Sequence, residues 1–397
     1  MKGNPPMTRK VIIGVCVAAV LSTVSCQQDQ PEPTAPANSV ELAKKAAQPK
    51  VDRIHLKLPA RARKIDQQFS KISRRVINPS DFECPPSTPL IDYLLGTINE
   101  ATTREPDVFN TLIGLAADIV PALDAILFET EATPGSQVFG YNGEYNRREA
   151  KIERDVKRFW DINSGGIQLV AMKGTMLLDV NRVARVYEAA FVNSDGTPIT
   201  HAQALFFANI VRTTLLQSVT MDRGNWPLFS FNAFAVPAGG GQPNKIAMGD
   251  GVLESYKAIG FDDVAPAAVY AHEFGHHIQF QRGYFNDRFA TTGSEAERTM
   301  YTELMSDAFS AYYLTHKRGA AMNKHRVAQF LQVFFDIGDC AFDDPGHHGT
   351  PNQRMRAANF GFSVAAQAQK QGHILTADQF HRLFVAAYPG LVAPDAT

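Results

Sequence analysis

Apolar residues recur at helical spacing along most of this chain, and strand-like patterns are confined to its middle. Apolar positions three and four apart predict two or three packed helices in 90–130, followed by a charged helix over 144–160. The stretch 167–178 has the pattern of a strand with a turn at Gly174, whereas 180–192 fits a strand or a helix. The pattern therefore predicts an α+β, mostly helical fold with a small sheet. Further helices are expected over 201–219, 320–337, 350–370 and 376–388.

The stretch 271–279 contains His272, Glu273 and His276 in the spacing His-Glu-x-x-His. Residues four apart lie on the same face of a helix, so both imidazoles can reach one cation. Zn²⁺ suits neutral imidazole, and Glu273 is close enough to take a proton from a water on the metal. The sequence therefore predicts an active-site helix here. Its expected ends are an N-cap at Asp262 or Asp263, Pro266 in the first turn and Gly283 as the stop.

A second helix, predicted over 294–317, supplies the third ligand. It opens with a capping box formed by Ser294 and Glu297. Glu303 and Asp307 follow, four apart on an otherwise apolar face, where carboxylates are costly to bury unless they are paired or bind metal. We therefore expect Glu303 to be the third Zn²⁺ ligand and Asp307 to hold the N–H of a ligating histidine.

Gly275 lies inside the predicted active-site helix, where glycine lowers stability relative to alanine. Its presence predicts that another backbone passes close to the metal ligands. The same residues also fit an amphipathic helix with incidental histidines, beside a helix with a solvated carboxylate edge. Neither of those two helices would hold a metal.

The motifs together resemble those of the gluzincin metallopeptidases, and the short connection between the two helices resembles the minigluzincin branch. His348 and Arg354 are similar to a late His and Arg in that branch, and also in bacterial neutral zinc metallopeptidases. The resemblance implies a zincin-like core in which His348 and Arg354 contact the substrate carbonyl or the oxyanion. It also implies an edge strand that lines the cleft and pairs with extended substrate. The residues similar to that strand are Asn232, Ala233, Phe234 and Ala235.

The predicted activity is zinc-dependent hydrolysis of peptide bonds in a protein or peptide substrate, with Glu273 as general base. Two alternatives stay open. One is an exported binding or scaffold lipoprotein with a structural or vestigial zinc site, and the other is a zinc amidase that acts on cell-wall material. A catalytic site needs an open coordination position with a base beside the metal, whereas a structural site needs neither.

The N-terminus predicts an exported protein. A charged start precedes the apolar run 11–21, which is too short to span a bilayer comfortably, and small residues then lead to Cys26. This arrangement resembles a bacterial lipoprotein signal with Cys26 as the lipid-bearing residue, and a plain secretory signal is the alternative. Gln27 after the cysteine favours the outer membrane, facing the periplasm or the exterior. The formal net charge of −1 argues against general nucleic-acid binding.

Cys84 and Cys340 remain after export. In an oxidising compartment they can pair as a disulfide, or they stay as two separate buried thiols. The expected parts of the chain are a signal segment (1–25), a flexible tether (26–50), an N-terminal helical region with a small strand segment (51–200) and a zincin-like catalytic domain (201–397).

Overall fold

The computed structural model describes only part of the chain. Several predicted features lie outside that part, so they stay predictions: the signal segment, the tether, Cys26, Cys84, Cys340 and His348. Among the described helices, none has the length and the apolar run that crossing a membrane requires. The described residues are 54–56, 88–133, 137–323, 326, 329–333, 349–371 and 373–393.

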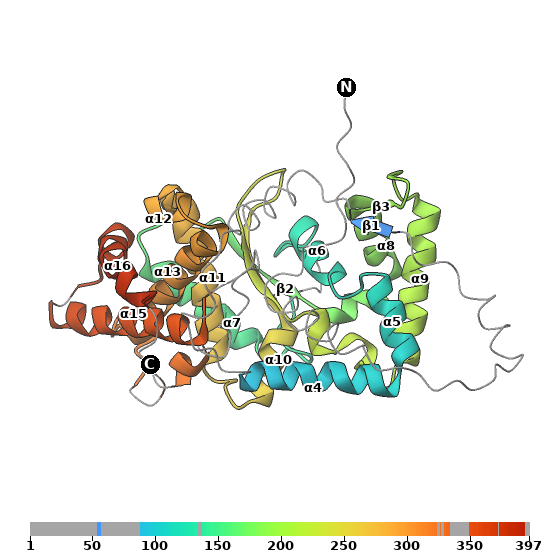
Figure 1. Cartoon of the computed structure of the whole chain (residues 1–397), viewed down its shortest axis with the longest axis horizontal. Helices are drawn as coiled ribbons and strands as arrows, with labels where there is room; N and C mark the ends of the chain where they lie inside the picture. Colours follow the sequence, from blue (N-terminus) through green and yellow to red (C-terminus); the bar gives the residue numbers. More distant parts are fainter. Residues whose placement is uncertain are drawn as a thin grey trace, which may run out of the picture.

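A three-stranded sheet separates two groups of helices (Figure 1). Its strands are β2 (Ile167–Met172), β5 (Asn244–Gly249) and β4 (Ala233–Val236), in the order β2-β5-β4. The central strand β5 runs parallel to β2 and antiparallel to β4, with Ile246 opposite both Leu169 and Ala235. The segment predicted to be an edge strand is therefore at an edge of the sheet.

The stretch predicted as strand over 167–178 is a strand only as far as Met172. A short 3₁₀ helix, η2 (Gly174–Leu178), follows. Its first residue, Gly174, lies against Gly224, whose carbonyl oxygen would be 2.2 Å from an added Cβ. The ambiguous stretch after it is helix α8 (Val180–Ala190), which Asp179 caps through its side chain. A second, two-stranded sheet joins β3 (Phe191–Asn193) to β1 (Ile54–Leu56).

The N-terminal helices bury the apolar positions that predicted them. The expected two or three helices in 90–130 are three, and Leu94, Leu112 and Leu123 are buried on them. These helices and their neighbours are α4 (Pro89–Arg104), α5 (Pro106–Gly114), α6 (Val120–Leu127), α7 (Asn146–Phe159) and α9 (His201–Gln217).

Capping boxes open four of the described helices, including the one that the sequence predicts at Ser294 and Glu297. Ser294 and Glu297 form the box of α13, Thr376 and Gln379 form that of α16, and Thr200 with Gln203 opens α9. Thr350 and Gln353 exchange the same pair of hydrogen bonds at the start of α15. The C-terminal helices are α10 (Asp250–Ala258), α11 (Ala265–Arg282), α12 (Arg288–Thr291), α13 (Glu295–Thr315), α15 (Pro351–Gln371) and α16 (Ala377–Leu391).

The predicted N-cap of α11 is wrong. Neither Asp262 nor Asp263 caps the helix, because the N–H groups of Val264 and Ala265 donate to the Phe261 carbonyl, and the first helical turn begins after both aspartates. The other two boundaries are confirmed. Pro266 lies in the first turn, and Gly283 ends the helix in the left-handed conformation.

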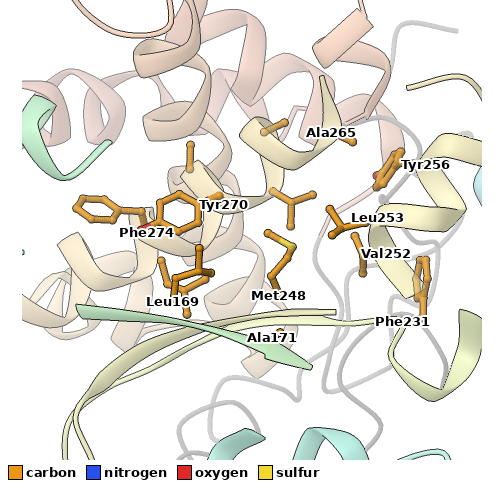
Figure 2. Close-up of a cluster of buried hydrophobic side chains, with 14 of the residues drawn as sticks. Leu169, Ala171, Phe231, Met248, Val252, Leu253, Tyr256, Ala265, Tyr270 and Phe274 are labelled. Atoms are coloured by element: carbon orange, nitrogen blue, oxygen red, sulfur yellow. The ribbon is translucent and has the colours of Figure 1, made fainter. Parts of the chain in front are cut away.

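One hydrophobic core joins the two halves of the described chain. Figure 2 shows Leu169 of β2 and Met248 of β5 facing Tyr270 and Phe274 of α11, with Leu253 of α10 alongside. Residues from both 51–200 and 201–397 therefore share one sheet and one core, and this core packs against one face of α11.

Candidate metal centre

Helix α11 places His272 and His276 one above the other. Their Nε2 atoms are 3.2 Å apart, and the two ring planes are nearly perpendicular, at 89°. Both side chains are buried, with exposed fractions of 6% and 4%. This is the arrangement that the helical spacing of four residues predicts.

Helix α13 brings Glu303 to the same point. Its Oε2 lies 3.2 Å from Nε2 of His272, and its Oε1 lies 3.3 Å from Nε2 of His276. One ligand atom from each of the three residues lies within 4.8 Å of the others. The buried cluster of His272, His276 and Glu303 could therefore hold a metal ion.

A close crossing of α11 and α13 makes this meeting possible. A Cβ on Gly275 would lie 2.3 Å from Oγ of Ser306 and 3.1 Å from its Cα, so the predicted close approach of another backbone at Gly275 is confirmed. The Ser306 hydroxyl donates to the His272 carbonyl, and Ser310 donates to the Ala268 carbonyl at 2.9 Å. These two hydroxyls tie the ligand helices together one turn apart.

Asp307 orients the first histidine. Nδ1–H of His272 donates to Oδ1 of Asp307 at 2.8 Å, which leaves Nε2 directed at the cluster. Burial would lower the pKa of His272, but the carboxylates of Asp307 and Glu303 outweigh it and raise the pKa to about 10. The histidine therefore holds a positive charge firmly whenever no cation replaces its proton.

Arg354 binds the same aspartate. Its Nε and one terminal nitrogen donate to the two oxygens of Asp307 at 2.8 and 2.7 Å, and that terminal nitrogen is 3.9 Å from Oε2 of Glu303. The guanidinium is 2% exposed and neutralises a buried carboxylate that would otherwise be costly. Contact with a substrate, which the resemblance implies for Arg354, stays a prediction.

Gln279 is a site residue that the sequence analysis missed. Its Oε1 accepts a hydrogen bond from Nδ1 of His276 at 2.9 Å, and its Nε2 donates to the Thr302 carbonyl at 2.6 Å. Helical spacing could have identified Gln279, because a residue three positions after His276 lies on the same helical face. An amide at that position can hold the second histidine as Asp307 holds the first.

Glu273 lies buried between the metal-ligand cluster and strand β4, which packs against α11. Burial raises the pKa of its carboxyl to about 7, although the charge on His272, the charge on Arg354 and the backbone N–H of Ala235 all act to lower it. A carboxyl that titrates near neutral pH can both accept and return a proton.

No protein-family model, curated protein or solved structure matches this chain.

His277 follows directly after the ligand His276 but faces away from the cluster. Its Nε2 donates to the Lys245 carbonyl of β5 at 3.0 Å. Complete burial lowers its pKa to about 4, so the ring is neutral and joins the helix to the sheet. Of the two consecutive histidines, only the first belongs to the metal-ligand cluster.

The predicted edge segment consists of Asn232 and the first three residues of β4, which begins directly after it at Ala233. The Asn232 carbonyl accepts from Gly249 N–H at 3.0 Å, which closes the end of the ladder with β5. In the part of the chain that the structure describes, no strand pairs with the other side of β4. The Ala235 N–H on β4 is directed at Glu273, so the free side of the strand faces the catalytic candidates.

Proposed function

We propose that this chain is a zinc-dependent metallopeptidase with a zincin-like core. The observation that carries the proposal is the convergence of three donor atoms, Nε2 of His272, Nε2 of His276 and a carboxylate oxygen of Glu303. Two imidazoles and one carboxylate are a donor set that catalytic zinc uses, and three protein ligands leave one coordination position open.

The hydrogen bonds around the cluster fit a cation there. Each imidazole donates its Nδ1–H to a fixed acceptor, Asp307 for His272 and Gln279 for His276. Both Nε2 atoms then present lone pairs toward the Glu303 carboxylate, as ligands of one ion must. Imidazole with carboxylate favours Zn²⁺ over Mg²⁺ or Ca²⁺, which prefer oxygen ligands alone.

The residues around the cluster supply the remaining parts of peptide hydrolysis. When bound, Zn²⁺ lowers the pKa of a coordinated water and polarises a carbonyl. Glu273 takes the proton of the attacking water and returns it to the leaving amine, for which a pKa of about 7 is well suited. The free side of β4 offers backbone hydrogen bonds to an extended peptide. His348 and Arg354 are proposed to stabilise the oxyanion on the strength of the family resemblance.

Glu273→Gln tests the role of the base. The amide keeps the shape of the side chain but cannot take a proton, so we expect zinc content to be unchanged while hydrolysis of casein falls by roughly 10²–10⁴-fold. Metal content after dialysis and casein cleavage with and without a chelator measure the two effects. Full activity in this variant would exclude Glu273 as the base.

Two controls separate the proposal from its alternatives. His276→Ala and Glu303→Ala should each lose the stoichiometric zinc of the wild type, because each removes one of three ligands. A wild type that keeps zinc but cleaves no casein would instead support a scaffold with a structural zinc site. Cleavage of peptidoglycan fragments but not casein would support the cell-wall amidase.

Export and a lipid anchor at Cys26 complete the proposal and rest on the sequence of 1–26 alone. They predict that the protein sediments with membranes, facing the periplasm or the exterior.

A further inference from the structure

The Gln279 side chain joins two metal-ligand positions that belong to different helices. It accepts from Nδ1 of His276, its neighbour one turn earlier on α11, and it donates to the Thr302 carbonyl on α13. Thr302 directly precedes Glu303, so this single side chain relates the second ligand to the backbone of the third. Gln279 has an exposed fraction of 0%, so no bulk water competes for either bond.

We infer that Gln279 is a positioning residue that sets the metal affinity of the site by holding His276 in register with Glu303. The inference rests on the proposed function, because it assumes that these residues bind a cation.

The chemistry of the side chain explains why an amide is needed here. The imidazole presents a donor and the Thr302 carbonyl presents an acceptor, so the residue between them must accept on one atom and donate on the other. An amide does both, whereas an ionised carboxylate only accepts. Asp307 differs because both of its partners, His272 and Arg354, are donors.

Charge gives a second reason for a neutral residue. The carboxyl groups of Glu273, Glu303 and Asp307 already surround the histidines, and the Arg354 guanidinium is bound to Asp307. A fourth carboxylate at Gln279 would add a buried charge with no cation of its own. The amide orients His276 without that cost.

The test compares zinc dissociation constants, measured by competition with a chelating dye, for wild type, Gln279→Leu and Gln279→Glu. Gln279→Leu removes both hydrogen bonds at similar volume, so we expect zinc to bind about 10–100-fold more weakly. Gln279→Glu keeps an acceptor for His276 but loses the donor to Thr302. Its zinc affinity should therefore lie between those of the wild type and Gln279→Leu. It also carries the test should Gln279→Leu not fold.

Gln281→Leu is the matched control. Gln281 lies on the same helix, and its amide likewise makes two hydrogen bonds, to the N–H and carbonyl of Asn163 at 3.0 and 2.9 Å, but it contacts no ligand. Its zinc affinity should stay within about threefold of wild type, since it supports no ligand. Equal weakening in Gln281→Leu and Gln279→Leu, or wild-type affinity in the Gln279 variants, would overturn the inference.

Zinc affinity and casein cleavage, measured separately, distinguish a failure of this inference from a failure of the proposed function. A wild type that binds zinc without cleaving casein contradicts the peptidase and leaves the affinity comparison intact. A wild type that binds no zinc overturns both.

Discussion

Buried carboxyl groups in this molecule differ sharply in how they are paired. Asp307 accepts hydrogen bonds from His272 and Arg354, whereas both oxygens of Glu149 on α7 are buried without a hydrogen-bond partner. Burial raises the pKa of Glu149 to about 8. Glu149 is therefore protonated in the folded protein near neutral pH but ionised in the unfolded chain.

Glu149 predicts a pH dependence of stability. Its folded pKa is above its ordinary value of 4.5, so its contribution to stability is fully present below about pH 4.5 and is lost as pH rises through about 8. Between about pH 5.5 and pH 8.5 the wild type should lose roughly 3 kcal/mol of unfolding free energy from this group. Glu149→Met, an uncharged side chain of similar size, should remove that loss.

Urea unfolding at the two pH values measures this difference. Asp250 and Glu273, whose pKa values are also raised, to about 6 and about 7, are present in both proteins, and their effects cancel in the comparison. The same loss of stability in wild type and Glu149→Met would mean that Glu149 does not carry the dependence.

At the scale of helices, the ligand cluster depends on how closely α11 and α13 can approach. Gly275 has no side chain at the crossing, so the Ser306 hydroxyl comes close enough to donate to the His272 carbonyl. Gly361 does the same between α15 and α13, where an added Cβ would lie 2.2 Å from the Ala308 carbonyl oxygen. Small residues thus bring three helices together around the site.

Gly275→Ala should destabilise the protein although alanine favours helix. The propensity gain is about 1 kcal/mol, but the added Cβ would lie 2.3 Å from the Ser306 hydroxyl and displace it from the His272 carbonyl. We expect a net loss of about 1–3 kcal/mol, together with weaker zinc binding. Thermal unfolding and dye competition measure these effects.

Gly96→Ala is the matched control for that substitution. Gly96 lies in α4, and an added Cβ would meet nothing within 4 Å, so the same change should stabilise the protein by about 0.5–1 kcal/mol. Stabilisation in Gly275→Ala as well would show that α11 and α13 can accommodate a methyl group at their crossing.

On the scale of the whole molecule, the N-terminal helical region is built into the structure that carries the site. Strand β2 extends the sheet beside β5, and Lys173 donates to Asp250 at 2.7 Å at the start of α10. The ammonium of Lys245 on β5 donates to the Ala125 carbonyl near the end of α6 at 2.9 Å. These contacts join residues that lie 77 to 120 positions apart in the chain.

A fragment containing only 201–397 should therefore not fold. It would expose the edge of β5 and the face of α11 that packs on Leu169. Each such lost contact costs about 2–5 kcal/mol, so the loss of several costs more than the 5–15 kcal/mol by which domains are typically stable. We expect no cooperative thermal transition and no zinc binding, while 51–397 shows both. A fragment that unfolds cooperatively and binds zinc would establish 201–397 as an independent domain.

Local sequence determined the features that depend on neighbours along the chain. Most of the longer helices, the capping box at Ser294, and the shared face of His272 and His276 follow from spacing, because a helix fixes the positions of residues three and four apart. The first cap of α11 was misjudged because a turn at Phe261 competes for the same backbone groups. Glu303 and Asp307 could be identified as candidate site residues from the cost of burying their charge.

Only the tertiary structure decided which of these side chains meet across helices. It brought Glu303 to the two histidines, let the Gln279 amide donate to a carbonyl of α13, and let the Arg354 guanidinium donate to Asp307. It also put β2 and β5 into one sheet. Such contacts depend on the distance and angle between elements, which the packing of the whole core sets and which periodicity along a single segment does not encode.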